Sequence, residues 1–224
     1  MRLPTAGAPP AGSAPPGGPR EAVSAVIVPV TAGALTGLIA AISYYDRLLR
    51  PLAHTFGLGI LLAVVASAGQ APRRAALRTS TAVFAAIVAF HLGQRLIYRI
   101  KYPGDAYAFS ANSLALWGLL ALAAGVVLGP LFARIGRSGW SGSAAAASAI
   151  GLLVADLRRR THNYPEDSAT LLTFAVLAVT IVVVLTAVTR RQLLRTALLI
   201  LPCAALAYFL ITTPLLELLP GIAR

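Results

Sequence analysis

The chain is poor in charged residues, and above all in acids. Only 12% of its 224 residues are charged, against roughly 25% in soluble domains, and 58% are hydrophobic. The remaining charges gather in short clusters between long apolar runs. Because each membrane span needs about 20 mostly apolar residues, this distribution disfavours a soluble domain and predicts a polytopic membrane protein.

Cysteine and the short motifs of common catalytic sites are also scarce. The one cysteine, Cys203, lies within an apolar run, so an internal disulfide is excluded, and no Cys/His spacing for a metal site is present. The chain has no nucleophile elbow, HExxH, Walker loop, glycine-rich dinucleotide loop or Asp-rich prenyl-diphosphate motif. We therefore predict neither a metal nor another cofactor.

The shortage of acids leaves a net charge of +12, because 19 Lys and Arg outnumber 7 Asp and Glu. Such a balance can indicate nucleic-acid binding. Here, however, the arginines stand at the ends of apolar runs, where they anchor a span and meet anionic lipid headgroups. We therefore expect membrane lipid, and not nucleic acid, as the partner.

What the chain does contain is a series of apolar runs behind a Pro/Gly/Ala-rich tail. Residues 1–22 lack an apolar core and are expected to be disordered. Residues 23–224 are expected to form one all-α domain of about seven transmembrane helices, since in lipid the backbone must pair within each helix. The expected spans are 23–43, 52–69, 75–95 (continuing to about 99), 109–133, 141–154, 169–188 and 196–216.

Two of these spans are rich in small residues, which favours close helix packing. Gly125 and Gly129 form a small-xxx-small face on the fourth span. The fifth span, 141–154, is short and consists largely of Ala, Ser and Gly. We expect this helix to be buried among its neighbours and shielded from lipid.

An odd number of spans assigns every loop to one end of the bundle. One end, which we call the polar end, collects six of the seven acids, all three histidines and six of the seven tyrosines. A purely structural bundle gives no reason for this asymmetry, so we expect a functional site there. Ten of the nineteen Lys and Arg lie at the other, N-terminal end, which favours a cytoplasmic N-terminus in the plasma membrane.

Two aspartates at the polar end are candidate catalytic acids. Asp156 is expected at the C-terminal end of the fifth span, where the helix dipole disfavours an anion and a partner is needed. Either Arg160, one turn on, is that partner, or Asp156 is held protonated against an apolar cavity as a proton donor. Asp46 ends the first span in the same way, with Arg50 as its i,i+4 partner.

A polar stripe crosses the same end of the third span. The residues on this helix face are His91, Gln94, Arg95 and Tyr98. Ionisable groups at this depth face water or the bundle interior, so Arg95 either snorkels to the headgroups or belongs to a polar wall for a ligand head. On the fourth span, Asn112 and Trp117 enter the membrane from this end, and Trp117 lies deep enough to line a pocket.

The fourth span resembles part of a known family. The segment Phe109-Ser-Ala-Asn-Ser-Leu-Ala-Leu-Trp-Gly118, followed by Gly129-Pro-Leu-Phe-Ala-Arg-Ile-Gly136, is similar to uncharacterised actinobacterial membrane proteins of the domain-of-unknown-function 6518 family. The resemblance spans about residues 85–165 and implies a multi-span helical bundle. The paired tyrosines that follow a glycine in the family are absent after Gly93, where Gln94 and Arg95 stand.

The same resemblance places a family acid on Asp156 and a family aromatic on Tyr164. Size and span number are also similar to those of the small seven-helix membrane terpene cyclases of meroterpenoid pathways, which implies acid-initiated cyclisation of the prenyl chain of a lipophilic substrate. Asp156 or Asp46 would donate the proton, and the π face of Trp117 would stabilise a carbocation. The residues expected to bind the remainder of the substrate are His91, Gln94, Arg95, Tyr98, Asn112 and Tyr164.

The alternative is a non-enzymatic membrane protein, either a small-solute transporter or an accessory subunit. A transporter would tend to show inverted repeats and helices broken at the midplane. The sequence has no visible repeat and its polar groups gather at one end, which counts against transport. An accessory subunit would tolerate loss of the two acids.

Overall fold

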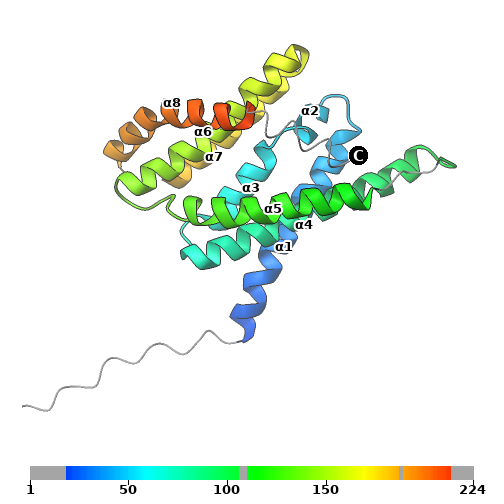
Figure 1. Ribbon diagram of the computed structural model, residues 1–224, viewed down its shortest axis with the longest axis horizontal. Coiled ribbons are helices and arrows are strands. Elements are labelled where there is room, and N and C mark those ends of the chain that lie inside the picture. Colours follow the sequence, from blue (N-terminus) through cyan, green and yellow to red (C-terminus); the bar gives the residue numbers. More distant parts are fainter. Residues whose placement is uncertain (1–18, 106–109, 187–188, 213–224) are drawn as a thin grey trace, which may run out of the picture.

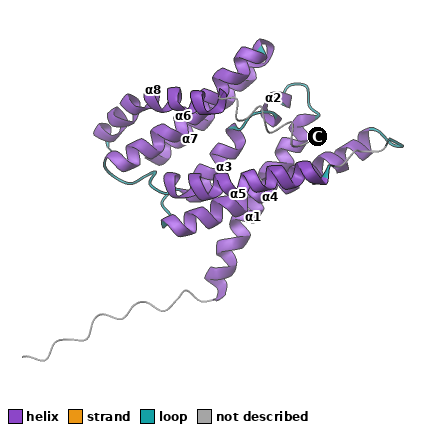
Figure 2. Ribbon diagram, viewed as in Figure 1, coloured by secondary structure: helices purple, strands orange, loops and turns teal. Residues whose placement is uncertain are grey.

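The computed structural model describes residues 19–105, 110–186 and 189–212, and these ranges contain helices and loops but no strand (Figure 2). The elements are α1 (Pro19–Tyr44), α2 (Arg50–Ala53), α3 (Gly57–Ser67), α4 (Pro72–Lys101), α5 (Ala111–Phe132), α6 (Trp140–Asn163), the 3-10 turn η1 (Pro165–Asp167), α7 (Ser168–Thr186) and α8 (Arg190–Thr212). The prediction of an all-α fold is confirmed.

Six of the described helices, α1 and α4 to α8, are long and apolar enough to cross a membrane, with candidate segments of 19 to 30 residues. Their outer surfaces carry large apolar side chains; Leu77, Val127 and Leu201, for example, are 67–78% exposed. Lipid would cover such side chains in a bilayer. The helices fit a multi-pass membrane protein and agree roughly with the expected seven spans.

The second expected span, 52–69, differs most from its prediction. It is divided into the single turn α2 and the 11-residue helix α3, with a loop between them. At 1.5 Å per residue, α3 is about 16 Å long, roughly half of the ~30 Å hydrocarbon layer. The polar pair His54-Thr55 separates the two helices, and Pro51 stands in the first turn of α2, where proline is well tolerated.

The long helices form two groups joined by α3. Helices α1, α4 and α5 pack together, as do α6, α7 and α8, while α3 touches members of both groups (Figure 1). The main apolar core lies where they meet, and includes Val64 of α3, Phe132 of α5, Ile150 of α6 and Val182 of α7. The short helix is therefore mostly buried between the two groups.

Helix α6 is the most enclosed of the six long helices, as its small residues predict. Of its apolar window 61% is buried, compared with 11–28% in the other five. Its end differs from the prediction: the helix does not stop near Asp156 but continues to Asn163. No residue in 157–163 breaks a helix, and the first proline after it is Pro165.

The start of α1 also differs from the prediction. The helix begins at Pro19, inside the segment 1–22 that was expected to be a disordered tail. Proline is favoured in the first turn of a helix, where its missing N–H has no partner to lose. The rest of that tail, residues 1–18, and the end of the last expected span, residues 213–216, lie outside the described residues.

Candidate functional site

A hollow of about 920 Å³ opens at the polar end. It is lined by the end of α1 and the turn that follows, by α2 and the residue after it, by the ends of α4 and α6, and by η1 and the start of α7. In Figure 1, α2 lies between the end of α6 (yellow) and the end of α4 (green). The hollow exists because a single turn and a half-length helix replace a full span, so that the longer neighbours extend past them.

The charged groups around the hollow are not paired with one another. The cations that line it are Arg47, Arg50, Lys101 and Arg160, and the acids are Asp46, Glu166 and Asp167. In the part of the chain that the structure describes, the only ion pair within 4.0 Å joins Arg159 to Asp156, neither of which lines the hollow. The lining therefore carries one net positive charge at neutral pH.

His54, the residue after α2, also lines the hollow, and two of these cations act on it. Its pKa is lowered from the ordinary 6.5, first because burial disfavours the charged imidazolium, and then because Arg160 and Arg50 repel it; Asp167 opposes the shift. His54 is therefore neutral at pH 7 and has one donor and one acceptor nitrogen. The ring of Tyr44 packs against it, with 5.2 Å between the ring centroids.

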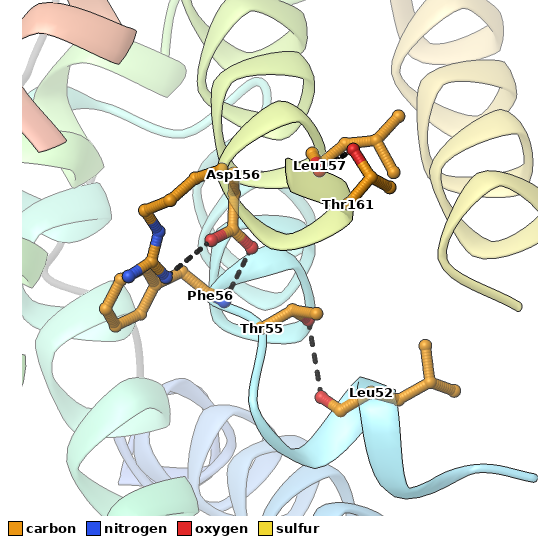
Figure 3. Close-up of polar contacts among 7 residues, drawn as sticks. Leu52, Thr55, Phe56, Asp156, Leu157 and Thr161 are labelled. Carbon is orange, nitrogen blue, oxygen red and sulfur yellow. Dashed lines mark hydrogen bonds and ion pairs between the residues drawn. The ribbon is translucent and has the colours of Figure 1, made fainter. Parts of the chain in front are cut away.

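Asp156 connects α6 to the start of α3 (Figure 3). It is 2% exposed, and its Oδ2 accepts a 2.8 Å hydrogen bond from the backbone N–H of Phe56. Its Oδ1 pairs with Arg159 Nη2 at 3.0 Å. Of the two alternatives drawn from the sequence, the pair with Arg160 is not formed among the described residues: Arg159 at i+3 pairs with Asp156, and Arg160 lines the hollow.

The guanidinium of Arg159 also lies over the ring of Phe56, 5.0 Å from its centroid. Phe56 is the residue before the first turn of α3, so one acid and one cation of α6 together hold the N-terminus of that helix. An anion at a helix N-terminus satisfies a backbone donor and complements the helix dipole. Both carboxylate oxygens of Asp156 therefore have a structural role, Oδ2 as acceptor for Phe56 and Oδ1 as partner of Arg159.

Asp46 is exposed and lines the hollow. Its Oδ1 accepts 2.9 Å hydrogen bonds from the backbone N–H groups of Leu48 and Leu49, which fixes the turn after α1. The expected ion pair with Arg50 is not formed among the described residues. The carboxylate of Asp46 binds backbone N–H groups in place of Arg50, because an aspartate side chain easily reaches the N–H groups two and three residues ahead within one tight turn.

The expected polar stripe lies along α4, outside the residues that line the hollow. His91 is half-buried, and its Nδ1 lies 3.0 Å from the carbonyl oxygen of Ile87. The backbone carbonyl of Gln94 accepts a 3.2 Å hydrogen bond from the Tyr45 hydroxyl. Arg95 is exposed, as expected for a side chain that snorkels to the headgroups.

The other expected binding residues lie on α4, on α5 and just after the end of α6. Tyr98 packs on Tyr102, with 4.9 Å between the ring centroids. Asn112, in the first turn of α5, is exposed, and Trp117 on the same helix is 40% exposed. Of the nine expected site residues, only Asp46 and Tyr164 line the hollow, where Tyr164 lies under the guanidinium of Arg160.

The hollow contains functional candidates that sequence reasoning passed over, chiefly Arg50, His54, Lys101 and Arg160. Arg50 and Arg160 were expected only as partners of the two aspartates. The signal that could have identified His54 is its position: with Thr55 it forms a polar pair near the start of an otherwise apolar run. In the described residues no group of three or more His, Cys, Asp or Glu is placed to hold a metal ion.

Comparison of the chain with protein-family models, with curated proteins and with solved structures finds no match. The hollow and the residues that line it are therefore the basis for inferring a function.

Proposed function

We propose that the chain is a small integral-membrane enzyme acting on a lipophilic substrate whose polar head enters the hollow. The hollow is the observation that supports this proposal: its volume of about 920 Å³ falls within the range of about 300–1,000 Å³ that is typical of small-molecule sites. Its lining combines charged groups with tyrosine rings, while the surrounding helices expose apolar side chains along which the substrate's chain can lie.

The reaction that we propose is acid-initiated cyclisation of a prenyl chain, and the geometry favours Asp46 over Asp156 as the acid. An acid that protonates a substrate needs an oxygen that can reach it. Both oxygens of Asp156 are already engaged, by Phe56 and Arg159, and the residue lies outside the hollow. Asp46 lines the hollow and uses only Oδ1 to hold its turn.

Mass spectrometry of organic extracts tests this proposal. A host fed prenylated aromatic and linear isoprenoid precursors would express wild type, Asp46→Asn, Asp156→Asn or no protein. Asparagine keeps the oxygen that accepts from Leu48 and Leu49, so Asp46→Asn preserves the turn and removes only the acid. We expect an isomer of a precursor with wild type and its loss with Asp46→Asn. Full activity in both variants would reject these acids as proton donors.

A non-enzymatic accessory role is the second candidate, and one observation favours it. Both aspartates already serve the fold as acceptors of backbone N–H groups. In this case the hollow would hold a lipid headgroup, and the same extracts would show no wild-type-specific isomer even though the protein is folded and abundant. A partner protein that co-purifies with wild type would then identify the assembly.

We also propose that the N-terminal end faces the cytoplasm and the polar end the outside. Ser138 and His162 are exposed at opposite ends of α6, and can be replaced singly by cysteine in a Cys203→Ser background. A membrane-impermeant maleimide added to intact cells should label His162→Cys at once and Ser138→Cys only after permeabilisation. The reverse pattern would invert the topology.

A further inference from the structure

We infer that the hollow recognises a phosphate ester on an amphiphile, through Arg50, His54 and Arg160. This inference deepens the proposed function, on which it rests, by naming the chemical class of the substrate's head. These three residues line the hollow and were not among the expected site residues.

The three residues come from two separate parts of the chain and all line the hollow, where both arginines act on His54. Arg50 opens α2, His54 follows its last residue, and Arg160 stands near the end of α6. The Nε of Arg160 is buried and has no hydrogen-bond partner among the described residues. The two Nη groups of Arg160, in contrast, are not among the buried unpaired atoms and form no hydrogen bond or ion pair with the described residues, so an oxygen of a ligand in the hollow can accept from them.

The charges at this point favour an anion. Arg160 and Arg50 both act on His54, and no carboxylate lies within ion-pair distance of either arginine in the described ranges. Guanidinium groups bind phosphate oxygens through two parallel N–H bonds, and a neutral imidazole adds one more donor. A phosphate group would therefore satisfy donors that the protein itself leaves unused.

The other lining residues limit the size and charge of this anion. Asp46, Glu166 and Asp167 bring the net charge of the lining down to one positive unit. Such a lining suits a single phosphate group better than a diphosphate or triphosphate, whose additional charges would face three carboxylates. The apolar residues Leu48, Pro51 and Leu171 also line the hollow, which suits the first carbons of an attached chain.

Native mass spectrometry of the full chain in non-ionic detergent can test this inference with matched probes. Geranylgeranyl phosphate and geranylgeraniol share one chain and differ only in the phosphate. We expect the phosphate to bind wild type at least about tenfold more tightly than the alcohol, since hydrogen bonds to charged groups contribute roughly a factor of ten each.

Competition with inorganic phosphate shows whether the site binds free phosphate or the phosphate head of a lipid. Displacement at concentrations similar to the probe's would identify a site for free phosphate, and displacement only at far higher concentrations, or none, a site for a lipid head.

Matched arginine variants locate the site. Arg160→Gln and Arg50→Gln should each weaken binding of geranylgeranyl phosphate about tenfold and leave geranylgeraniol unaffected. Arg158→Gln is the control, because Arg158 is exposed on the same helix end and does not line the hollow. An equal loss in Arg158→Gln, or equal binding of the two probes by wild type, would overturn the phosphate site. Equal binding would still leave a substrate site in the hollow, whereas failure of both probes to bind would reject the proposed function as well.

A labelling experiment on the wild-type chain does not depend on how well the variants fold. A photoactivatable diazirine placed next to the phosphate of the same prenyl phosphate should cross-link to peptides that contain residues 44–54 or 158–171. Cross-links confined to the N-terminal end of the bundle would overturn the inference.

Discussion

Replacing Asp156 by alanine is expected to lower the free energy of unfolding by about 3 kcal/mol, the typical effect of removing one partner of a buried charged pair. The substitution leaves the backbone N–H of Phe56 without its acceptor at the start of α3. It also removes the anion that Arg159 faces at 3.0 Å. Denaturant unfolding of the purified chain in detergent, followed by tryptophan fluorescence, would measure the loss.

Two further variants identify the origin of this effect. Asp156→Asn keeps an oxygen for Phe56 but loses the ion pair, so it should be less destabilising than Asp156→Ala. Asp46→Ala is the matched control, because Asp46 likewise accepts backbone N–H bonds, from Leu48 and Leu49, but is exposed, and its loss should cost about 1 kcal/mol. A fully stable Asp156→Ala protein would contradict the structural role and would restore Asp156 as a candidate proton donor.

Loss of activity in an Asp156 variant can come from unfolding as well as from loss of an acid. If Asp156→Ala unfolds part of the chain, a loss of product says nothing about proton transfer. The comparison that bears on catalysis is Asp46→Asn, since the asparagine retains the hydrogen bonds of the turn. Its activity should therefore be related to the amount of folded protein, with wild type as the reference.

The membrane character and the buried α6 could be predicted because they depend on composition and local spacing. Long apolar runs between arginine clusters produce the six long apolar helices. The Ala, Ser and Gly of residues 141–154 have too little side-chain volume to cover a lipid-facing surface, and α6 is indeed the most enclosed of the long helices. Membrane character and the burial of α6 can both be inferred from the sequence of each helix taken by itself.

The hollow could not be predicted in this way, because it arises from differences in length between helices that are distant in the sequence. An average over residues 52–69 is strongly apolar and conceals the break at His54 and Thr55. Likewise, the cluster at Arg158, Arg159 and Arg160 resembles the end of a span, although the helix continues through it. Which arginine faces Asp156 and which faces the hollow is decided by helix rotation.

The contact between α1 and α4 is another feature that the sequence of a single helix does not reveal. The glycine pair of the fourth span was expected to pack closely, and a Cβ on Gly129 would indeed lie 2.7 Å from the carbonyl oxygen of Ala75. A second pair, Gly33 and Gly37 on α1, faces Ala82 and Ala86 of α4 at the same spacing and went unnoticed. Only the structure shows that these two helices share this extensive interface.

Replacing Gly37 by leucine is expected to separate α1 from α4 and to lower the free energy of unfolding by about 3 kcal/mol or more, at the upper end of overpacking effects. A Cβ at Gly37 would collide with the backbone carbonyl of Ala86, and one at Gly33 with that of Ala82. Because these are backbone atoms of a long helix, no rotamer change can relieve the contact, and the helices must move apart. Unfolding in detergent and the fraction of monodisperse protein in size-exclusion chromatography would measure the effect.

A graded series of glycines separates this steric effect from a general effect of adding a side chain. A Cβ on Gly59 of α3 would meet nothing within 4 Å, so Gly59→Ala should be neutral or should stabilise the helix by about 0.5–1 kcal/mol. A Cβ on Gly118 would meet the ring of Phe84 at 3.0 Å, which a small rotation of that ring can relieve, so Gly118→Ala should have an intermediate effect. Gly37→Ala should be the most destabilising of the three alanine variants, since its contact is with backbone. If all three lowered stability equally, the close approach of α1 and α4 would not be the cause.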